Sequence, residues 1–256
     1  MNQHKPDPLL SANIEFSVDG RAVSLTVQVP AGPVSPQRLL PLAHALTNTI
    51  VDMAVEAQDE PVSCAKGCGA CCRQLVPIST VEARAIHALV QAMEEPRRST
   101  LIARFEDACR RMEAAGLMDR LRDFSRVARK DLVAFGLDYF GRGVPCPFLE
   151  DESCSIHADR PVVCREFLVS SDPRHCAKPS PQTVRRIELG ARVSRALPAL
   201  EAPESAPAMP WLPLILALEW AAAHPEERER PGPELLQALF GSLSGKDLPA
   251  PPGLGA

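Results

Sequence analysis

Residues 64–72 read CAKGCGACC, a run with the spacing C-x3-C-x2-C-C. Residues 73–145 separate this run from a second group of four cysteines, which extends over residues 146–176. Clustered thiols in a reducing compartment more often bind metal or perform redox chemistry than form structural disulfides. The pattern therefore predicts a cysteine-ligated metal site. The expected ligands are Cys64, Cys68, Cys71, Cys72, Cys146, Cys154, Cys164 and Cys176.

The first run can curl around a metal because Gly67 and Gly69 lie inside it. Glycine adopts positive φ angles without strain and leaves main-chain N–H groups open to hydrogen-bond the thiolates. Cys71 and Cys72 are adjacent, so their side chains point about 100° apart in a helix. One tetrahedral ion does not take both without strain, and one of the two is expected to ligate a second metal, to support a ligand without binding the metal itself, or to act as a redox thiol.

The number of thiols exceeds the need of one simple site. A structural zinc takes four ligands, and a [4Fe–4S] cluster takes about four cysteines. Eight clustered cysteines are compatible with two sites, one site with spare redox thiols, or a larger multinuclear cluster. If both groups meet at one centre, metal binding closes the loop formed by residues 73–145 and is coupled to folding.

Proline and basic residues surround the second group. Pro147 and Pro161 stiffen the loops that follow Cys146 and precede Cys164. Three arginines are placed to offset thiolate charge, and two histidines could complete a mixed site. These residues are Arg73, Arg160, Arg165, His157 and His175.

Composition limits the function classes. The net charge of -4 and the pI of about 5.9 leave no overall basic field, which argues against a nucleic-acid partner or an anionic membrane. The first residues do not form a secretory signal, and the longest apolar run, near residues 212–223, is too short to span a bilayer. We therefore expect a cytoplasmic protein with reduced thiols and no membrane contact.

Hydrophobic periodicity predicts the elements. Residues 14–29 alternate around an Asp19–Gly20 turn, which is typical of a β-hairpin. Ser79 and Glu82 have the spacing of a capping box, and Cys109 lies on an apolar helix face, which favours a core thiol over a ligand. The predicted helices cover residues 36–58, 79–93, 99–112, 119–135, 180–196, 214–223 and 233–242.

The predicted fold class is mainly α, with a small N-terminal β-hairpin and irregular metal-binding cysteine loops between helices. The expected divisions are an N-terminal hairpin and helix over residues 1–60 and a cysteine-cluster metal-binding domain over 61–180. C-terminal helices with a proline-rich linker follow over 181–247, and a disordered tail over 248–256.

The motifs C-x3-C-x2-C-C, C-P-F-L, C-x-I-H-x-x-R-P and V-C-R, taken in order, resemble the YkgJ-like cysteine-cluster family, a zinc- or iron-chelating domain. The resemblance covers Cys64–Cys176, under half of the chain, and implies that the same eight cysteines bind the metal. His157 stands where the family usually has tyrosine and could add a ligand. Some members carry the domain beside an activity that methylates flagellin lysines, but residues 1–60 and 177–256 contain no recognisable methyl-donor pocket.

Three functions remain in competition. The first is a metal-binding protein that holds zinc or an iron–sulfur cluster of the 4Fe–4S type in a redox, metal-handling or structural role. The second is a radical S-adenosylmethionine-type enzyme, because Cys64, Cys68 and Cys71 fit its C-x3-C-x2-C signature, although Ala70 replaces the usual aromatic residue and no βα repeats follow. The third is a zinc-stapled interaction module that docks a protein partner through its C-terminal helices.

Overall fold

The computed structural model describes residues 8–180, 182–201, 211–225 and 227–244. Helices, including short 3₁₀ turns, hold about 52% of these residues, and the strands pair in two-stranded antiparallel sheets. This confirms the predicted mainly α chain with an N-terminal hairpin. The predicted tail at 248–256 and most of the proline-rich linker lie outside the described residues. None of the described helices combines the length and apolar character needed to cross a bilayer.

The hairpin consists of β1 (Leu9–Val18) and β2 (Arg21–Pro30). Asp19 and Gly20 both have positive φ, 50° and 77°, as a type I′ turn requires. Side chains alternate between solvent and core along both strands, so the hairpin is polar on one face and apolar on the other. Its buried residues are Ile14, Val18, Val23, Val27 and Val29.

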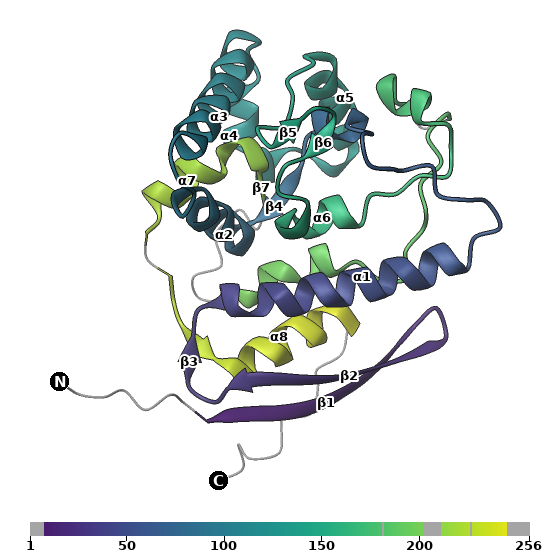
Figure 1. Ribbon diagram of the computed structural model, residues 1–256, viewed down its shortest axis with the longest axis vertical. Helices are drawn as coiled ribbons and strands as arrows, with labels where there is room; N and C mark the ends of the chain where they lie inside the picture. The colour runs from purple at the N-terminus through teal and green to yellow at the C-terminus, as the bar shows by residue number, and fades with distance from the viewer. Residues whose placement is uncertain (1–7, 181, 202–210, 226, 245–256) are drawn as a thin grey trace.

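The apolar face of the hairpin packs below two helices, α1 (Leu40–Glu56) and α8 (Gly232–Ser244) (Figure 1). The rings of Phe16 and Phe240 lie 5.8 Å apart between their centroids in this layer. Buried residues of the hairpin, of α1 and α8, and of residues 193–200 pack together. We call them the hairpin core. Short elements complete it: β3 (Pro33–Val34), η1 (Pro36–Leu39), η7 (Val193–Arg195), η8 (Leu197–Leu200) and β8 (Arg230–Pro231).

A second set of buried residues, the helical core, is built largely from residues 78–148. Cys109 packs against this core, and its thiol donates a hydrogen bond of 3.4 Å to the carbonyl of Ile215, in agreement with its predicted core position. The elements are β4 (Pro77–Ser79), α2 (Thr80–Gln91), α3 (Arg97–Ala114), α4 (Met118–Arg122), α5 (Leu132–Gly141), β7 (Trp211–Pro213), η10 (Leu214–Leu216) and α7 (Ala217–Ala223).

The predicted helix over 119–135 is wrong. The chain instead forms α4, two 3₁₀ turns named η3 (Phe124–Arg126) and η4 (Arg129–Asp131), and then α5. The rings of Phe124 and Phe135 lie 6.3 Å apart, whereas a continuous helix would separate these residues by about 16 Å along its axis. The chain folds back because both rings pack together at the helical core.

The predicted helix over 180–196 is also wrong. Its described residues are mostly irregular, and residues 185–187 run alongside residues 168–170, with a bridge between Val169 and Arg186. The N–H of Ile187 donates to the carbonyl of Leu168 at 2.9 Å. Here main-chain hydrogen bonds to a distant segment replace the i to i−4 bonds that local periodicity suggested.

Candidate metal centre

The eight clustered cysteines lie on short elements and in one loop. Cys64 and Cys68 occupy the loop before η2 (Ala70–Arg73), which contains Cys71 and Cys72. Of the second group, Cys146 precedes β5 (Leu149–Glu150), and the others follow in short elements. Those elements are β6 (Ser153–Cys154), α6 (Val162–Arg165) with Cys164, and η6 (Pro173–Ala177) with Cys176.

Main-chain hydrogen bonds join the two groups directly. The N–H of Cys146 donates to the carbonyl of Cys72 at 2.6 Å, so the ends of the loop 73–145 meet. The N–H of Ser63, next to Cys64, donates to the carbonyl of Val169 at 3.0 Å, and its hydroxyl binds the carbonyls of Val169 and Ser171. The structure therefore brings together two groups that are distant in sequence.

Cys71 lies where the two groups meet. A hydrogen bond with Cys72, followed by burial, raises the pKa of the Cys71 thiol far above its ordinary value. Burial is the main cause that raises the pKa of five further thiols, and repulsion from a Cys71 thiolate adds to it in each case. These five thiols, one from the first group and four from the second, are Cys64, Cys146, Cys154, Cys164 and Cys176.

Main-chain N–H groups are ready to stabilise thiolates at three positions. Burial raises the pKa of Cys146 to about 12, and a hydrogen bond from the N–H of Phe148 opposes this rise. Burial also raises the pKa of Cys154, and the N–H of Ile156 opposes it in the same way. In both cases the donor lies two residues after the cysteine. Val169 supplies the same kind of bond to Cys64. Such donors stabilise metal-bound thiolates and orient them.

The arginines take different positions around the cysteines. Arg160 lowers the pKa of Cys64, Cys71 and Cys154, although burial outweighs it for Cys64 and Cys154. Arg73 forms two hydrogen bonds with Glu152, at 2.6 and 3.0 Å, and another with the carbonyl of Gly69. Arg160 is thus the cation that faces several thiols, whereas Arg73 is held in an ion pair at the edge.

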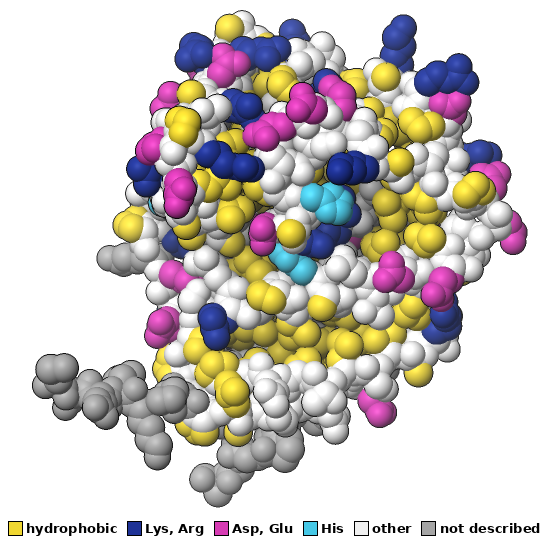
Figure 2. Space-filling model, in the orientation of Figure 1, with side chains coloured by type: hydrophobic (Ala, Val, Ile, Leu, Met, Phe, Trp, Pro, Cys, Tyr) yellow, Lys and Arg dark blue, Asp and Glu magenta, His cyan; other side chains and the backbone are white. Residues whose placement is uncertain are grey.

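The histidines lie close to cations. The pKa of His157 is lowered first by the charge of Arg160 and then by burial. His44, on α1, lies 3.4 Å from Arg165, and burial followed by that arginine lowers its pKa to about 4. Histidine and basic side chains lie next to one another on the face shown in Figure 2. His44 lies outside the cysteine motifs, and no sequence pattern pointed to it.

The chemistry of the cysteine side chains suits a metal site, but their present spacing does not. Thiolates are the ligands that zinc and iron–sulfur clusters prefer, so the donor set fits. In the part of the chain that the structure describes, however, no three His, Cys, Asp or Glu side chains lie close enough to hold one metal ion. The thiols are gathered but not arranged for coordination, and we expect their side chains to turn inward when metal binds.

Residues 63–181 match the model of the CxxCxxCC family, which is described as a "putative zinc- or iron-chelating domain". The matched segment makes up just under half of the chain and is similar to this domain. The match confirms the resemblance to a cysteine-cluster family and supports a metal-binding role. The matched segment contains all eight clustered cysteines and the whole helical segment between them. No curated protein and no solved structure matches the chain.

A cavity of about 760 Å³ opens beside the clustered cysteines. Its walls come from η2, η6 and α5, so it borders the elements that carry Cys71, Cys72 and Cys176. Apolar and charged side chains both line it. The lining includes Ala70, Arg73, Leu137, Phe140, Glu152 and Lys178. This side of the centre is therefore open to solvent and to molecules in solution.

The raised pKa values predict that metal uptake depends steeply on pH. The shifted thiols are protonated at neutral pH, so each one that binds metal must release its proton. Lowering the pH from 8 to 6 should weaken zinc binding, by up to about 10⁴-fold per pH unit for four protonated ligands. Chelator competition at pH 6, 7 and 8 measures this. An affinity that stays constant would show that the ligands are already thiolates, contrary to the raised pKa values.

Proposed function

We propose that this protein binds zinc or an iron–sulfur cluster in one composite centre to which both cysteine groups contribute. The observation that carries the proposal is the contact between the groups: Cys146 binds the carbonyl of Cys72, and a charge on Cys71 acts on thiols of both. The CxxCxxCC match gives independent support. The proposed ligands are drawn from Cys64, Cys68, Cys71, Cys72, Cys146, Cys154, Cys164 and Cys176.

We infer a role in metal handling or redox chemistry and not in structural stapling. The segments that carry Cys146, Cys154 and Cys164 contribute residues to one of two apolar cores, which are formed by side chains alone. A structural zinc is usually found where a domain is too small to build such a core. Seven of the eight clustered cysteines also keep partial solvent exposure, and a cavity opens beside them. Access of this kind suits exchange of metal or electrons.

The thiol count favours an iron–sulfur cluster over a single zinc ion. Eight thiols exceed the four ligands of one zinc, and the adjacent Cys71 and Cys72 do not suit one tetrahedral ion. Main-chain N–H donors to sulfur are also a means by which proteins set cluster potentials. Anaerobic purification followed by metal analysis and electron paramagnetic resonance would distinguish the two. Stoichiometric zinc without iron in such a preparation would overturn the preference for a cluster.

The radical S-adenosylmethionine alternative gains no support from the fold. Enzymes of that class need parallel strands from βα repeats to build a partial barrel. Within the ranges that the structure describes, the strands form two-stranded antiparallel sheets only. Production of 5′-deoxyadenosine by the reconstituted protein would nevertheless reverse this preference.

Substitutions in each group test whether the centre is composite. Cys68→Ser and Cys164→Ser should each lower total metal content, by half or more, because each removes a ligand of the same centre. Cys109→Ser is the matched control, since Cys109 lies outside the two cysteine groups and its thiol donates a hydrogen bond to the carbonyl of Ile215. Elemental analysis of the three variants measures the outcome. Loss of separate metals in the two variants, with the other retained in full, would indicate two independent sites.

Removal of metal tests whether the metal serves handling or redox chemistry or instead holds the fold together. Chelation under reducing conditions should leave the helical content unchanged and lower the thermal midpoint without unfolding the chain at room temperature, because side chains form the two cores and chelation removes only the contribution of metal binding to stability. Circular dichroism before and after chelation provides the measurement, with addition of metal back as the control for reversibility. Global unfolding of the metal-free chain would instead support the zinc-stapled interaction module.

A further inference from the structure

A buried carboxylate, Glu82, serves two helices at once. One of its oxygens, Oε2, accepts hydrogen bonds from the N–H and the hydroxyl of Ser79, at 2.9 and 3.0 Å, and completes the capping box of α2. The other oxygen, Oε1, accepts a hydrogen bond of 2.8 Å from the N–H of Val162. Val162 is the first residue of α6, the four-residue helix that carries Cys164.

The helix α6 is too short to hold its own position. The N–H groups of Cys164 and Arg165 both donate to the carbonyl of Pro161, at 3.0 and 3.2 Å, and form little more than one turn. The first N–H groups of any helix have no partner within it, so that of Val162 depends on Glu82. Because Glu82 is 4% exposed, water does not readily replace the carboxylate if it is lost.

The far end of α6 has separate anchors. The carboxylate of Glu166 accepts hydrogen bonds from the N–H and hydroxyl of Ser194, at 2.9 and 2.6 Å. Arg165 binds the carbonyl of Arg160 at 3.1 Å and the side chain of Asn48, on α1, at 3.3 Å. These contacts tie α6 to the hairpin core. Glu82 ties it to α2, whose residues Ala83, Ile86 and Val90 belong to the helical core.

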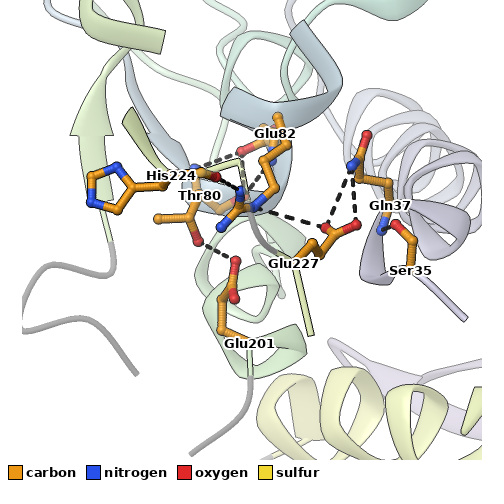
Figure 3. A network of polar contacts seen from close by, with 9 residues as sticks. Ser35, Gln37, Thr80, Glu82, Glu201, His224 and Glu227 are labelled. Atoms are coloured by element: carbon orange, nitrogen blue, oxygen red, sulfur yellow. Dashed lines mark hydrogen bonds and ion pairs between the residues drawn. The ribbon is translucent and has the colours of Figure 1, made fainter. Parts of the chain in front are cut away.

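Glu82 also faces the cysteine on that helix. Burial is the main cause that raises the pKa of Cys164, and the charge of Glu82 is one of the causes that add to it. Figure 3 shows Glu82 at the start of α2, within a polar network in which Thr80 binds Glu201 and Gln37 binds Glu227. The carboxylate therefore lies at a fixed place between α2, α6 and Cys164.

We propose that Glu82 is a positioning residue for Cys164, which it holds toward the other cysteines through its hydrogen bond to the first N–H of α6. The inference rests on the proposed function, because Cys164 is taken as a ligand of the composite centre. The capping-box spacing revealed the local role of Glu82 in α2. Its second role depends on a contact with a segment 80 residues further along the chain.

The substitution Glu82→Gln separates these roles. Glutamine has nearly the same shape, but only one of its two terminal atoms accepts hydrogen bonds. If its oxygen keeps the two bonds to Ser79, its NH₂ group faces the N–H of Val162 and the link to α6 is lost. Ser79→Ala is the matched control, because it removes one capping partner from α2 but leaves the bond between Glu82 and Val162 intact.

A second variant removes the same bond from the opposite side. Val162→Pro lacks the N–H donor, and proline is well suited to the first position of a helix. The preceding residue, Pro161, has φ −52° and ψ 151°, an extended conformation that a following proline accepts. The capping box at Ser79 is untouched. This variant therefore tests the link without changing Glu82.

The experiment uses Co(II) as the metal probe on the full chain under anaerobic conditions. Glu82→Gln and Val162→Pro should each raise the Kd for Co(II) at least tenfold and reduce the thiolate-to-cobalt absorption, whereas Ser79→Ala should change neither by more than twofold. In a Cys164→Ser background, Glu82→Gln should cause no further loss, because the two changes act on one ligand. Equal losses in both backgrounds, or a loss with Ser79→Ala as large as with Glu82→Gln, would overturn the proposal.

Alkylation of the metal-free chain separates this inference from the proposed function. If the wild-type chain binds no Co(II), the proposed function fails, yet the position of Cys164 can still be measured by its rate of reaction with iodoacetamide. Glu82→Gln should accelerate modification of Cys164 at least fivefold relative to Ser79→Ala, with Cys109 as the internal reference. An unchanged rate at Cys164 would contradict the positioning role.

Discussion

The arrangement of the cysteines depends on one constraint: the main chain at Cys146 lies against the main chain at Cys72. The hydrogen bond between these residues closes a loop made of residues 73–145, and α2 to α5 fill that loop. Closing a loop of this length costs conformational entropy, which the apolar packing of the helical core offsets. On this account the fold first brings the two cysteine groups together, and their side chains then turn inward to bind the metal.

The same arrangement explains why a site without three converged ligands can still be a metal centre. Protonated thiols do not repel one another, so the chain tolerates many of them in a crowded, partly buried place. Thiolates would repel, and burial together with mutual repulsion keeps the pKa of most of them high. A metal cation reverses this balance, and the N–H donors from Phe148 and Ile156 favour the thiolate form once it is present.

Local patterns in the sequence predicted the local structure. The hairpin with its Asp19–Gly20 turn, the capping box of Ser79 and Glu82, and the helices α1 to α3 form close to their predicted positions. The failures over 119–135 and 180–196 arose where distant contacts replaced local ones. For the same reason the sequence identified the eight cysteines as a group but could not identify His44 or the second bond of Glu82, which depend on tertiary contacts.

Differential alkylation read by mass spectrometry tests the central claim that both cysteine groups form one centre. The chain is labelled with and without bound metal, and each cysteine serves as its own reporter. The account predicts that metal protects cysteines of both groups, including Cys64 and Cys164, while the labelling of Cys109 does not change. Protection confined to residues 64–72, or to residues 146–176, would contradict a composite centre.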